Sequence, residues 1–203
     1  MVEWSIEAFR ACDSVRSIVV AAPPGHIGDL GGHDLGVVAG GETRAQSVAN
    51  ALEAVGTEYV AVHDAARPLL TPELVKALVT DLDAAPEAAG VIAAAPVTDT
   101  VKRGSFRTDS VQKEPRNVVE TVDRSQLWAA QTPQVFRTDA LRAALTAAER
   151  PQEATDEAML VEWNGGTVLI HPVAGQNLKV TTPLDLRVAE LLLAERAESA
   201  AGA

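Results

Sequence analysis

The chain has 203 residues, enough for one well-packed domain (1–203), and its 47% hydrophobic but only 3% aromatic composition predicts a core of alanine, valine and leucine. A formal net charge of −11 disfavours nonspecific binding to nucleic acid or to an anionic membrane. A single cysteine excludes an intramolecular disulfide, no apolar run reaches the roughly 20 residues that span a bilayer, and no signal peptide opens the chain, so we expect a cytoplasmic protein.

The first part of the chain predicts a helix, two strands and a second helix. Residues 1–12 have helical apolar spacing, residues 16–22 form a buried strand, and residues 28–36 form a surface loop. A short strand at 35–39 leads through Gly40 and Gly41 into a helix that ends at Gly56. Paired glycines at a strand-to-helix junction leave backbone N–H groups available to an anion or a base edge, although an ordinary tight turn has the same pattern.

The rest of the chain is organised around residues 60–68, VAVHDAARP. A short apolar run followed by polar residues and Pro68 predicts a buried strand that delivers Asp64 and Arg67 to a loop at its carboxyl end. Open α/β sheets bind their ligands at this edge. Asp64 and Arg67 are therefore either part of a binding site or an ion pair that closes the end of a strand.

The next segments repeat the order of strand and helix. Thr71 and Pro72 predict the start of a helix whose apolar face extends to Leu82, and residues 90–95 predict a buried strand that ends in the polar stretch 96–103. This alternation favours an α/β fold with a mostly parallel, doubly wound sheet.

Residues 104–122 break this rhythm with two polar segments, 105–112 and 117–122, that favour β-structure. They predict a projecting hairpin with too little core to stand alone, so we expect it to pack on a second subunit as a dimerisation arm, with a solvated flap as the alternative. Residues 123–134 predict a helical turn and an extended segment, with Trp128 in the core.

The last part predicts two helices, a strand and a final helix. Thr138 caps a helix that Pro151 closes, and Thr155 is a candidate N-cap for a helix that ends at residues 165–166. A strand follows at 167–173, in which His171 is more typical of a sheet residue than of a ligand. Residues 182–185, TPLD, form a capping box that opens a helix through Leu193, and we expect residues 198–203 to fray.

Residues just past the strand ends of a doubly wound sheet lie along one edge. We therefore expect one crevice lined by Gly41, Asp64, Arg67, Thr100 and Lys179. Seven ordered motifs spread over nearly the whole chain carry a resemblance: GGETRAQSV (40–48), VHDAARP (62–68), PVTDTVK (96–102), DRSQLW (123–128), QTPQ (131–134), TDEA (155–158) and NLKVTTP (177–183). With these motifs the chain resembles the 2-C-methyl-D-erythritol 4-phosphate cytidylyltransferases, which catalyse the third step of the non-mevalonate isoprenoid pathway.

The resemblance implies a reaction in which the phosphate of methylerythritol phosphate attacks the α-phosphorus of CTP, with Mg²⁺ bound and pyrophosphate leaving. It makes Asp64, Lys179 and Arg124 the expected catalytic residues, with Asp64 holding both the metal and the substrate and Lys179 facing the phosphates. Cytidine would be bordered by Gly41, Ser47 and Ala65. Methylerythritol phosphate would be bound by Arg67, Thr100, Arg124, Thr132 and Thr155. The resemblance also implies a homodimer whose arm lends Arg124 and Thr132 across the interface.

These residue types suit the implied chemistry. Joining two anionic phosphates needs charge neutralisation and in-line positioning more than acid–base catalysis, so an aspartate that holds a metal and several lysines and arginines are expected. Since the net charge repels both substrates at long range, local cations and Mg²⁺ must act at close range.

One departure from the family pattern bears on activity. The family begins with a strand and a Gly-rich loop, roughly AAGxGxR, followed by a PKQ segment, and this chain has neither. We therefore expect a truncated N-terminus from a start site placed too far downstream, a groove with exposed strand edges in the middle of the sheet, low stability and impaired turnover. The alternatives are a ribitol-5-phosphate cytidylyltransferase and a catalytically dead dimerising remnant.

Overall fold

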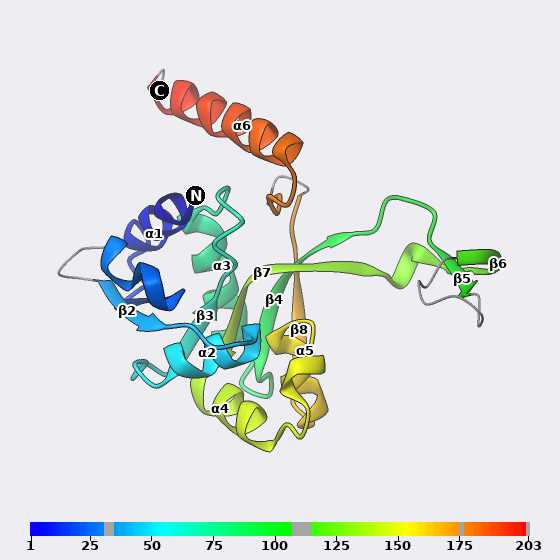
Figure 1. Ribbon diagram of the computed structural model, residues 1–203, viewed down its shortest axis with the longest axis horizontal. Coiled ribbons are helices and arrows are strands. Elements are labelled where there is room, and N and C mark those ends of the chain that lie inside the picture. The colour runs from blue at the N-terminus through cyan, green and yellow to red at the C-terminus, as the bar shows by residue number, and fades with distance from the viewer. Residues whose placement is uncertain (31–34, 107–114, 175–176, 202–203) are drawn as a thin grey trace.

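The computed structural model describes residues 1–30, 35–106, 115–174 and 177–201 (Figure 1). The helices are α1 (Val2–Arg10), α2 (Arg44–Leu52), α3 (Pro72–Asp83), α4 (Thr138–Ala147), α5 (Glu157–Trp163) and α6 (Pro183–Ala201), with short 3₁₀ turns η1 (Pro24–Asp29), η2 (Arg124–Gln126) and η3 (Pro151–Glu153). The strands are β1 (Ile18–Ala22), β2 (Leu35–Ala39), β3 (Tyr59–Val62), β4 (Gly90–Pro96), β5 (Lys102–Phe106), β6 (Pro115–Thr121), β7 (Trp128–Arg137) and β8 (Val168–Pro172).

The central sheet has four strands in the order β3-β7-β4-β8. β4 and β8 are parallel, while β7 is antiparallel to both of its neighbours, β3 and β4. β1 and β2 form a separate parallel pair. The predicted α/β fold with mostly parallel strands is therefore confirmed, with β7 as the exception because the chain re-enters the sheet there from the arm.

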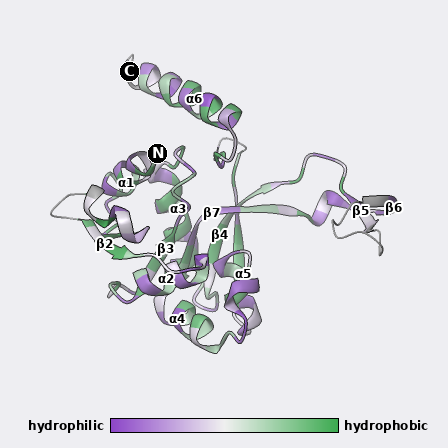
Figure 2. Ribbon diagram, in the orientation of Figure 1, coloured by the Kyte–Doolittle hydropathy of each residue, from purple (hydrophilic) through white to green (hydrophobic). Residues whose placement is uncertain are grey.

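Helices cover both faces of the central sheet, as a doubly wound fold requires. Val91 and Val135 pack on one face with Leu78 and Leu82 of α3. On the other face, Phe136 packs in a cluster with residues of α2, α4 and α5. Figure 2 shows hydrophobic residues concentrated along these central strands. The alternation along β4 and β7 thus builds two cores and leaves the carboxyl end of β3 free for polar groups.

A cavity of about 510 Å³ separates β1 from β3. Among the described residues, β1 and β3 belong to different sheets and do not pair with each other. Both strands contribute apolar side chains to the lining of the cavity. All four residues of β3 are only partly buried, whereas a strand inside a parallel sheet is normally covered on both faces. The groove predicted from the sequence is therefore present between two unpaired strand edges.

The arm consists of β5 and β6, an antiparallel pair that forms a sheet of its own. Figure 1 shows it projecting from the body beyond the ends of β4 and β7. Residues 107–114 lie outside the described residues, so the predicted strand 105–112 is observed only as far as Phe106. The predicted loop 28–36 has residues 31–34 outside the described chain, and η1 occupies its beginning.

Five sequence predictions need correction. α2 ends at Leu52 rather than at Gly56, because the chain turns before the glycine. Thr138 is the first residue of α4 rather than its N-cap, which is Arg137, and its buried hydroxyl makes no hydrogen bond within the described residues. Trp128 is 38% exposed rather than in the core, because β7 there has left the body for the arm.

The other two corrections concern α5 and α6. Asp156, not Thr155, caps α5, since its carboxylate accepts from the Met159 N–H at 3.0 Å. The predicted capping box at the start of α6 is confirmed by the exchange between Thr182 and Asp185, but the helix continues to Ala201 instead of ending at Leu193. No described helix is long and apolar enough to cross a membrane.

Candidate active site

Asp64 follows β3 closely and lies among three cations from three parts of the chain. Its Oδ2 is 3.0 Å from the Lys179 Nζ and 3.7 Å from the Arg67 Nε, and its Oδ1 is 3.4 Å from an Arg44 nitrogen. Burial on its own would raise the pKa of Asp64, but the hydrogen bond from Lys179 and the charges of Arg44 and Arg67 outweigh burial and lower it. Asp64 is therefore held as a carboxylate at the carboxyl end of β3.

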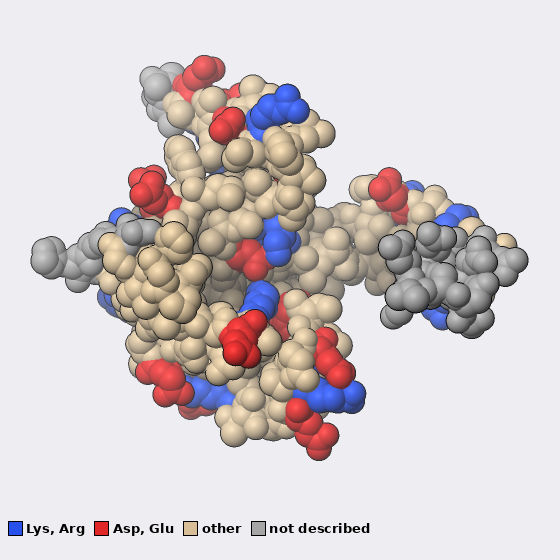
Figure 3. Space-filling view, in the orientation of Figure 1, with Lys and Arg blue, Asp and Glu red and all other residues tan. Residues whose placement is uncertain are grey.

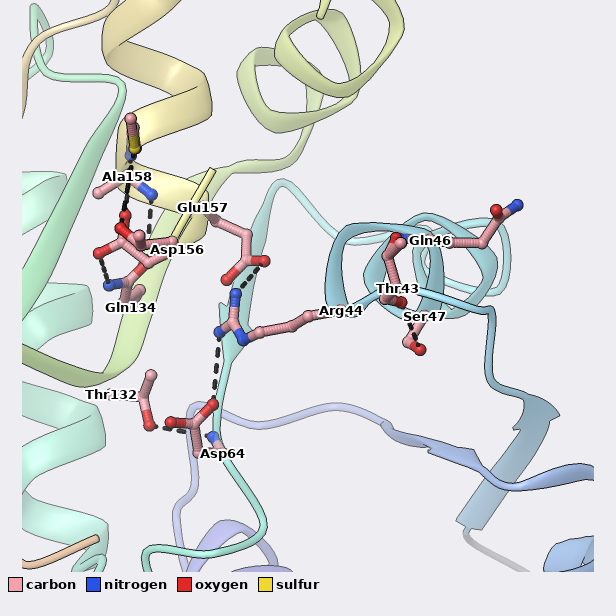
Figure 4. A network of polar contacts seen from close by, with 12 residues as sticks. Thr43, Arg44, Gln46, Ser47, Asp64, Thr132, Gln134, Asp156, Glu157 and Ala158 are labelled. Carbon is pink, nitrogen blue, oxygen red and sulfur yellow. Dashed lines mark hydrogen bonds and ion pairs between the residues drawn. The ribbon is translucent and has the colours of Figure 1, made fainter. Parts of the chain in front are cut away.

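Arg44, the first residue of α2, joins Asp64 to Glu157 at the start of α5. One guanidinium nitrogen contacts the Glu157 Oε1 and another contacts the Asp64 Oδ1 (Figure 4). Burial disfavours the charge on Arg44, yet the two acids together raise its pKa. Glu157 is 1% exposed, and burial raises its pKa despite the attraction of Arg44. The site thus contains alternating acids and bases that span α2, α5 and the end of β3.

A hydrogen-bonded chain beneath Asp64 fixes its backbone. The Thr132 hydroxyl accepts from the Asp64 N–H at 3.0 Å and lies 3.1 Å from the His63 Nδ1. The His63 Nε2 lies 3.1 Å from the Arg67 carbonyl, so it must carry the proton, and the Thr132 hydroxyl donates to Nδ1. Burial lowers the pKa of His63 from 6.5 to about 4, which keeps this neutral form at physiological pH.

Arg67 and Asn177 fasten the segment that carries Lys179. Arg67 donates to the Asn177 carbonyl at 2.7 Å, and the Asn177 side chain donates to the Thr132 carbonyl at 2.7 Å. Both side chains are buried, and burial lowers the pKa of Arg67. Arg67 is thus both an ion-pair partner of Asp64 and a structural tie, as the ion-pair interpretation of residues 60–68 predicts.

The loop before α2 brings Gly41 against the helix. The Gly41 N–H donates to the Ser47 hydroxyl at 3.0 Å, and that hydroxyl donates to the Thr43 carbonyl. A Cβ on Gly41 would lie 2.0 Å from the Gln46 side chain, so only glycine fits this turn. The Gly41 N–H is therefore already used inside the chain rather than available to an anion or a base.

The predicted site residues divide into two groups in space. Asp64, Ala65 and Ser47 line one end of the cavity between β1 and β3, together with Arg44 and His63. Figure 3 shows basic and acidic side chains meeting in a hollow near the centre of this face. Asp64 lines this cavity and so faces an opening, as predicted, and Arg67, Thr132 and Lys179 lie in direct contact with it.

Thr100, Arg124 and Thr155 lie apart from this cluster. Thr100 is exposed on the segment that leads into the arm, and Arg124 in η2 contacts the Thr98 carbonyl. Thr155 is exposed just before α5, with its hydroxyl 3.7 Å from the Met159 sulfur. Among the described contacts, none joins these three to Asp64.

Thr132 departs from its expected position. It is 3% exposed within its own chain, and its hydroxyl accepts from the Asp64 N–H and donates to His63. This corrects the expectation that a partner subunit receives Thr132, because a side chain buried in one subunit cannot also reach into another.

Sequence reasoning missed Arg44, Glu157, His63 and Asn177 as parts of the site. Each lies inside one of the seven motifs, so the motif boundaries contained the signal. Nothing in the spacing pairs Arg44 with Glu157, because 113 positions separate them and only the packing of α5 beside α2 brings them together.

Residues 1–195 match the family model "IspD: 2-C-methyl-D-erythritol 4-phosphate cytidylyltransferase". The chain belongs to this family. A relative with that name from Paraburkholderia phymatum is 39% identical over 95% of this chain and 84% of its own length. The bifunctional enzyme IspD/IspF of Anaeromyxobacter dehalogenans is 41% identical over 93% of this chain, which spans only 49% of that longer protein.

Solved structures agree with this assignment. The crystal structure of 2-C-methyl-D-erythritol 4-phosphate cytidylyltransferase from Thermus thermophilus superposes with a TM-score of 0.75 and 34% sequence identity, over 94% of this chain and 87% of that one. The fold is therefore that of an IspD nucleotidyltransferase, and the chain is a member of a transferase family of the non-mevalonate pathway.

Proposed function

We propose that the chain transfers a cytidylyl group from CTP to 2-C-methyl-D-erythritol 4-phosphate and releases pyrophosphate. The observation that carries the proposal is Asp64, a carboxylate kept ionised among Lys179, Arg67 and Arg44 at the carboxyl end of β3. Relatives and solved neighbours named for this reaction support the choice of substrates.

The proposed chemistry is a displacement at the α-phosphorus of CTP by a phosphate oxygen of the acceptor. Both reactants are anions, so the site must lower their repulsion and hold them in line. Lys179 is 46% exposed and only 3.0 Å from Asp64, so its ammonium can turn from the carboxylate to a phosphate with little movement. Lys179 and Asp64 are therefore the proposed catalytic residues of this chain.

The residues present suit a divalent cation that arrives with the nucleotide. Mg²⁺ is usually held by one or two carboxylates together with substrate phosphates and water. Asp64 provides one ionised carboxylate with lone pairs to spare, and the described residues contain no group of three or more acidic, histidine or cysteine side chains that would form a complete metal cage. When bound, the ion neutralises phosphate charge, and Asp64 is the residue that would hold it.

The nucleotide base is assigned to the loop before α2. Gly41, Ser47 and Ala65 are the proposed border of cytidine; Ser47 and Ala65 line the cavity next to Asp64, while Gly41 is fixed by its bond to Ser47. The Ser47 hydroxyl orders the loop from inside, so its contribution to base binding is the shape of the turn.

The acceptor is assigned to Arg67, Thr100, Arg124, Thr132 and Thr155, with Thr132 acting through Asp64. Thr100 and Arg124 lie on or beside the arm, away from Asp64 of their own chain, which supports a homodimer in which each arm serves the other subunit. The proposal includes a cytoplasmic location, with which the free, buried Cys12 is compatible.

The surface of the arm also supports the homodimer. Val118 and Val119 on β6 are 65% and 63% exposed, as expected for a surface that a partner covers. Substitution of Val118 by lysine should therefore shift sedimentation from dimer to monomer. An unchanged chain that sediments as a monomer would contradict the proposed homodimer.

Pyrophosphate release tests the proposed reaction. The full chain is incubated with CTP, Mg²⁺ and either methylerythritol phosphate or ribitol 5-phosphate as the acceptor. We expect release that depends on methylerythritol phosphate and is at least about tenfold slower with ribitol 5-phosphate. Faster turnover with ribitol 5-phosphate would contradict the acceptor assignment, and absence of Mg²⁺-dependent CTP binding by calorimetry would identify a remnant instead. The predicted impairment of turnover in this chain is tested by the same rates of pyrophosphate release.

A further inference from the structure

We propose that Arg44 is a positioning residue for Asp64 and that the buried Glu157 is the anchor that holds Arg44 in place. The inference rests on the proposed function for its catalytic meaning. Arg44 contacts both acids with different nitrogens of one rigid guanidinium fork (Figure 4). The position of Glu157 therefore fixes where the second nitrogen meets Asp64.

The anchor is itself locked by the core. Gln134 of β7, 1% exposed, accepts from the Ala158 N–H at 3.2 Å and donates to the Asp156 carboxylate at 2.8 Å. These two bonds hold the first turn of α5 against β7, so Glu157, between the two residues that Gln134 contacts, has a fixed backbone. Arg44 thus receives its position from the central sheet.

The two oxygens of Asp64 are held by different cations. Arg44 approaches Oδ1 at 3.4 Å and Lys179 approaches Oδ2 at 3.0 Å. Because each oxygen is contacted by a cation from a different part of the chain, the plane of the Asp64 carboxylate has one preferred orientation. The longer contact from Arg44 orients Oδ1 without occupying all of its lone pairs, which leaves that oxygen available to a ligand.

The burial of Glu157 argues against a purely stabilising ion pair. Its Oε2 is buried and makes no hydrogen bond within the described chain, and desolvating such an acid usually costs as much as the pair returns. A well-packed apolar residue would join α2 and α5 at least as well. The buried acid at Glu157 is therefore better explained by the contact that Arg44 makes with Asp64.

The test compares crystal structures of the unchanged chain and Glu157→Leu, which fills the same buried space without the charge. We expect the Arg44 guanidinium to swing into solvent, because its side chain is already 37% exposed, and the Asp64 carboxylate to rotate. Arg44 still within about 4 Å of Asp64 would overturn the proposal. If Glu157→Leu does not fold, the double variant Arg44→Leu/Glu157→Leu, which leaves no unpaired buried charge, gives the reading of the Asp64 rotation.

Kinetics with a double-mutant cycle give the second measurement. We expect Glu157→Leu and Arg44→Leu each to lower kcat about tenfold or more. The double variant should lower it no further, because each single variant already removes the contact between Arg44 and Asp64. Glu153→Leu, which breaks the exposed Arg150–Glu153 pair, is the matched control and should keep kcat within about twofold. Additive losses, or a lower melting temperature with unchanged kcat, would assign Glu157 a structural role only. If the unchanged chain transfers no cytidylyl group, the proposed function fails, while the crystal structures still decide whether Glu157 positions Arg44.

Discussion

At the scale of single residues, the site depends on which group carries a proton and which a charge. Asp64 stays ionised because cations outweigh its burial, and His63 stays neutral because burial dominates. The neutral His63 accepts from Thr132, which in turn accepts from the Asp64 N–H. Protonation of His63 at Nδ1 would remove the acceptor of the Thr132 hydroxyl and so disturb the hydrogen bond that holds the Asp64 backbone.

The pH dependence of stability follows from the lowered pKa of His63. Between pH 6.5 and about 4, the unfolded chain binds a proton on His63 that the folded chain does not. The free energy of unfolding should therefore hold its full His63 contribution above pH 6.5 and fall by up to about 3 kcal/mol as the pH drops to 4. Urea unfolding across this range measures it.

His63→Gln is the control, since glutamine keeps one donor and one acceptor but takes up no proton. The difference in unfolding free energy between the unchanged chain and His63→Gln should shrink or reverse as the pH falls toward the lowered pKa of about 4. A difference that does not vary with pH would show that His63 titrates normally in the folded chain.

At the scale of elements, the buried Gln134 amide ties the first turn of α5 to β7. Gln134→Leu keeps the volume but leaves the Ala158 N–H and one Asp156 oxygen without their partner. Burying unsatisfied polar groups costs about 1–3 kcal/mol, so the free energy of unfolding should fall by that amount. Gln126→Leu, at an exposed position in η2, should change it by less than about 0.5 kcal/mol. Equal effects of the two substitutions would contradict the role given to Gln134.

Local signals predicted most elements, and long-range packing decided the rest. Thr71 accepts from the Leu74 N–H as its pattern predicts, and the capping box at Thr182 is present, because both depend on neighbours in sequence. Trp128 was not predictable in this way, since its exposure depends on where the arm leaves the body. The pairing of Arg44 with Glu157 likewise depends on tertiary contact between two helices.

At the scale of the whole molecule, the cavity between β1 and β3 divides the sheet. Its lining is largely apolar and includes the two strand edges, so it weakens the join between the β1–β2 pair and the rest of the body. Because apolar surface left open to water contributes no stabilisation, we expect a marginally stable chain.

A small-to-larger substitution measures this open space. Ala61 of β3 lines the cavity, so Ala61→Val should leave the free energy of unfolding unchanged or raise it by up to about 1 kcal/mol. Ala93 of β4 is fully buried in a packed core, and Ala93→Val should lower it by about 1–3 kcal/mol. Similar losses for both variants in thermal or urea unfolding would mean that the space beside β3 is closed in solution.

The central claim is that Asp64 is the acid around which cytidylyl transfer takes place. The most direct measurement is the rate of CMP transfer from labelled CTP to methylerythritol phosphate by the unchanged chain, by Asp64→Asn and by Asp139→Asn, which alters a carboxylate that is 99% exposed on α4. We predict that Asp64→Asn lowers the rate at least about 100-fold, because asparagine keeps the shape but loses the charge that faces the cations and the metal. Asp139→Asn should keep the rate within about twofold. An Asp64→Asn variant as active as Asp139→Asn would contradict the account.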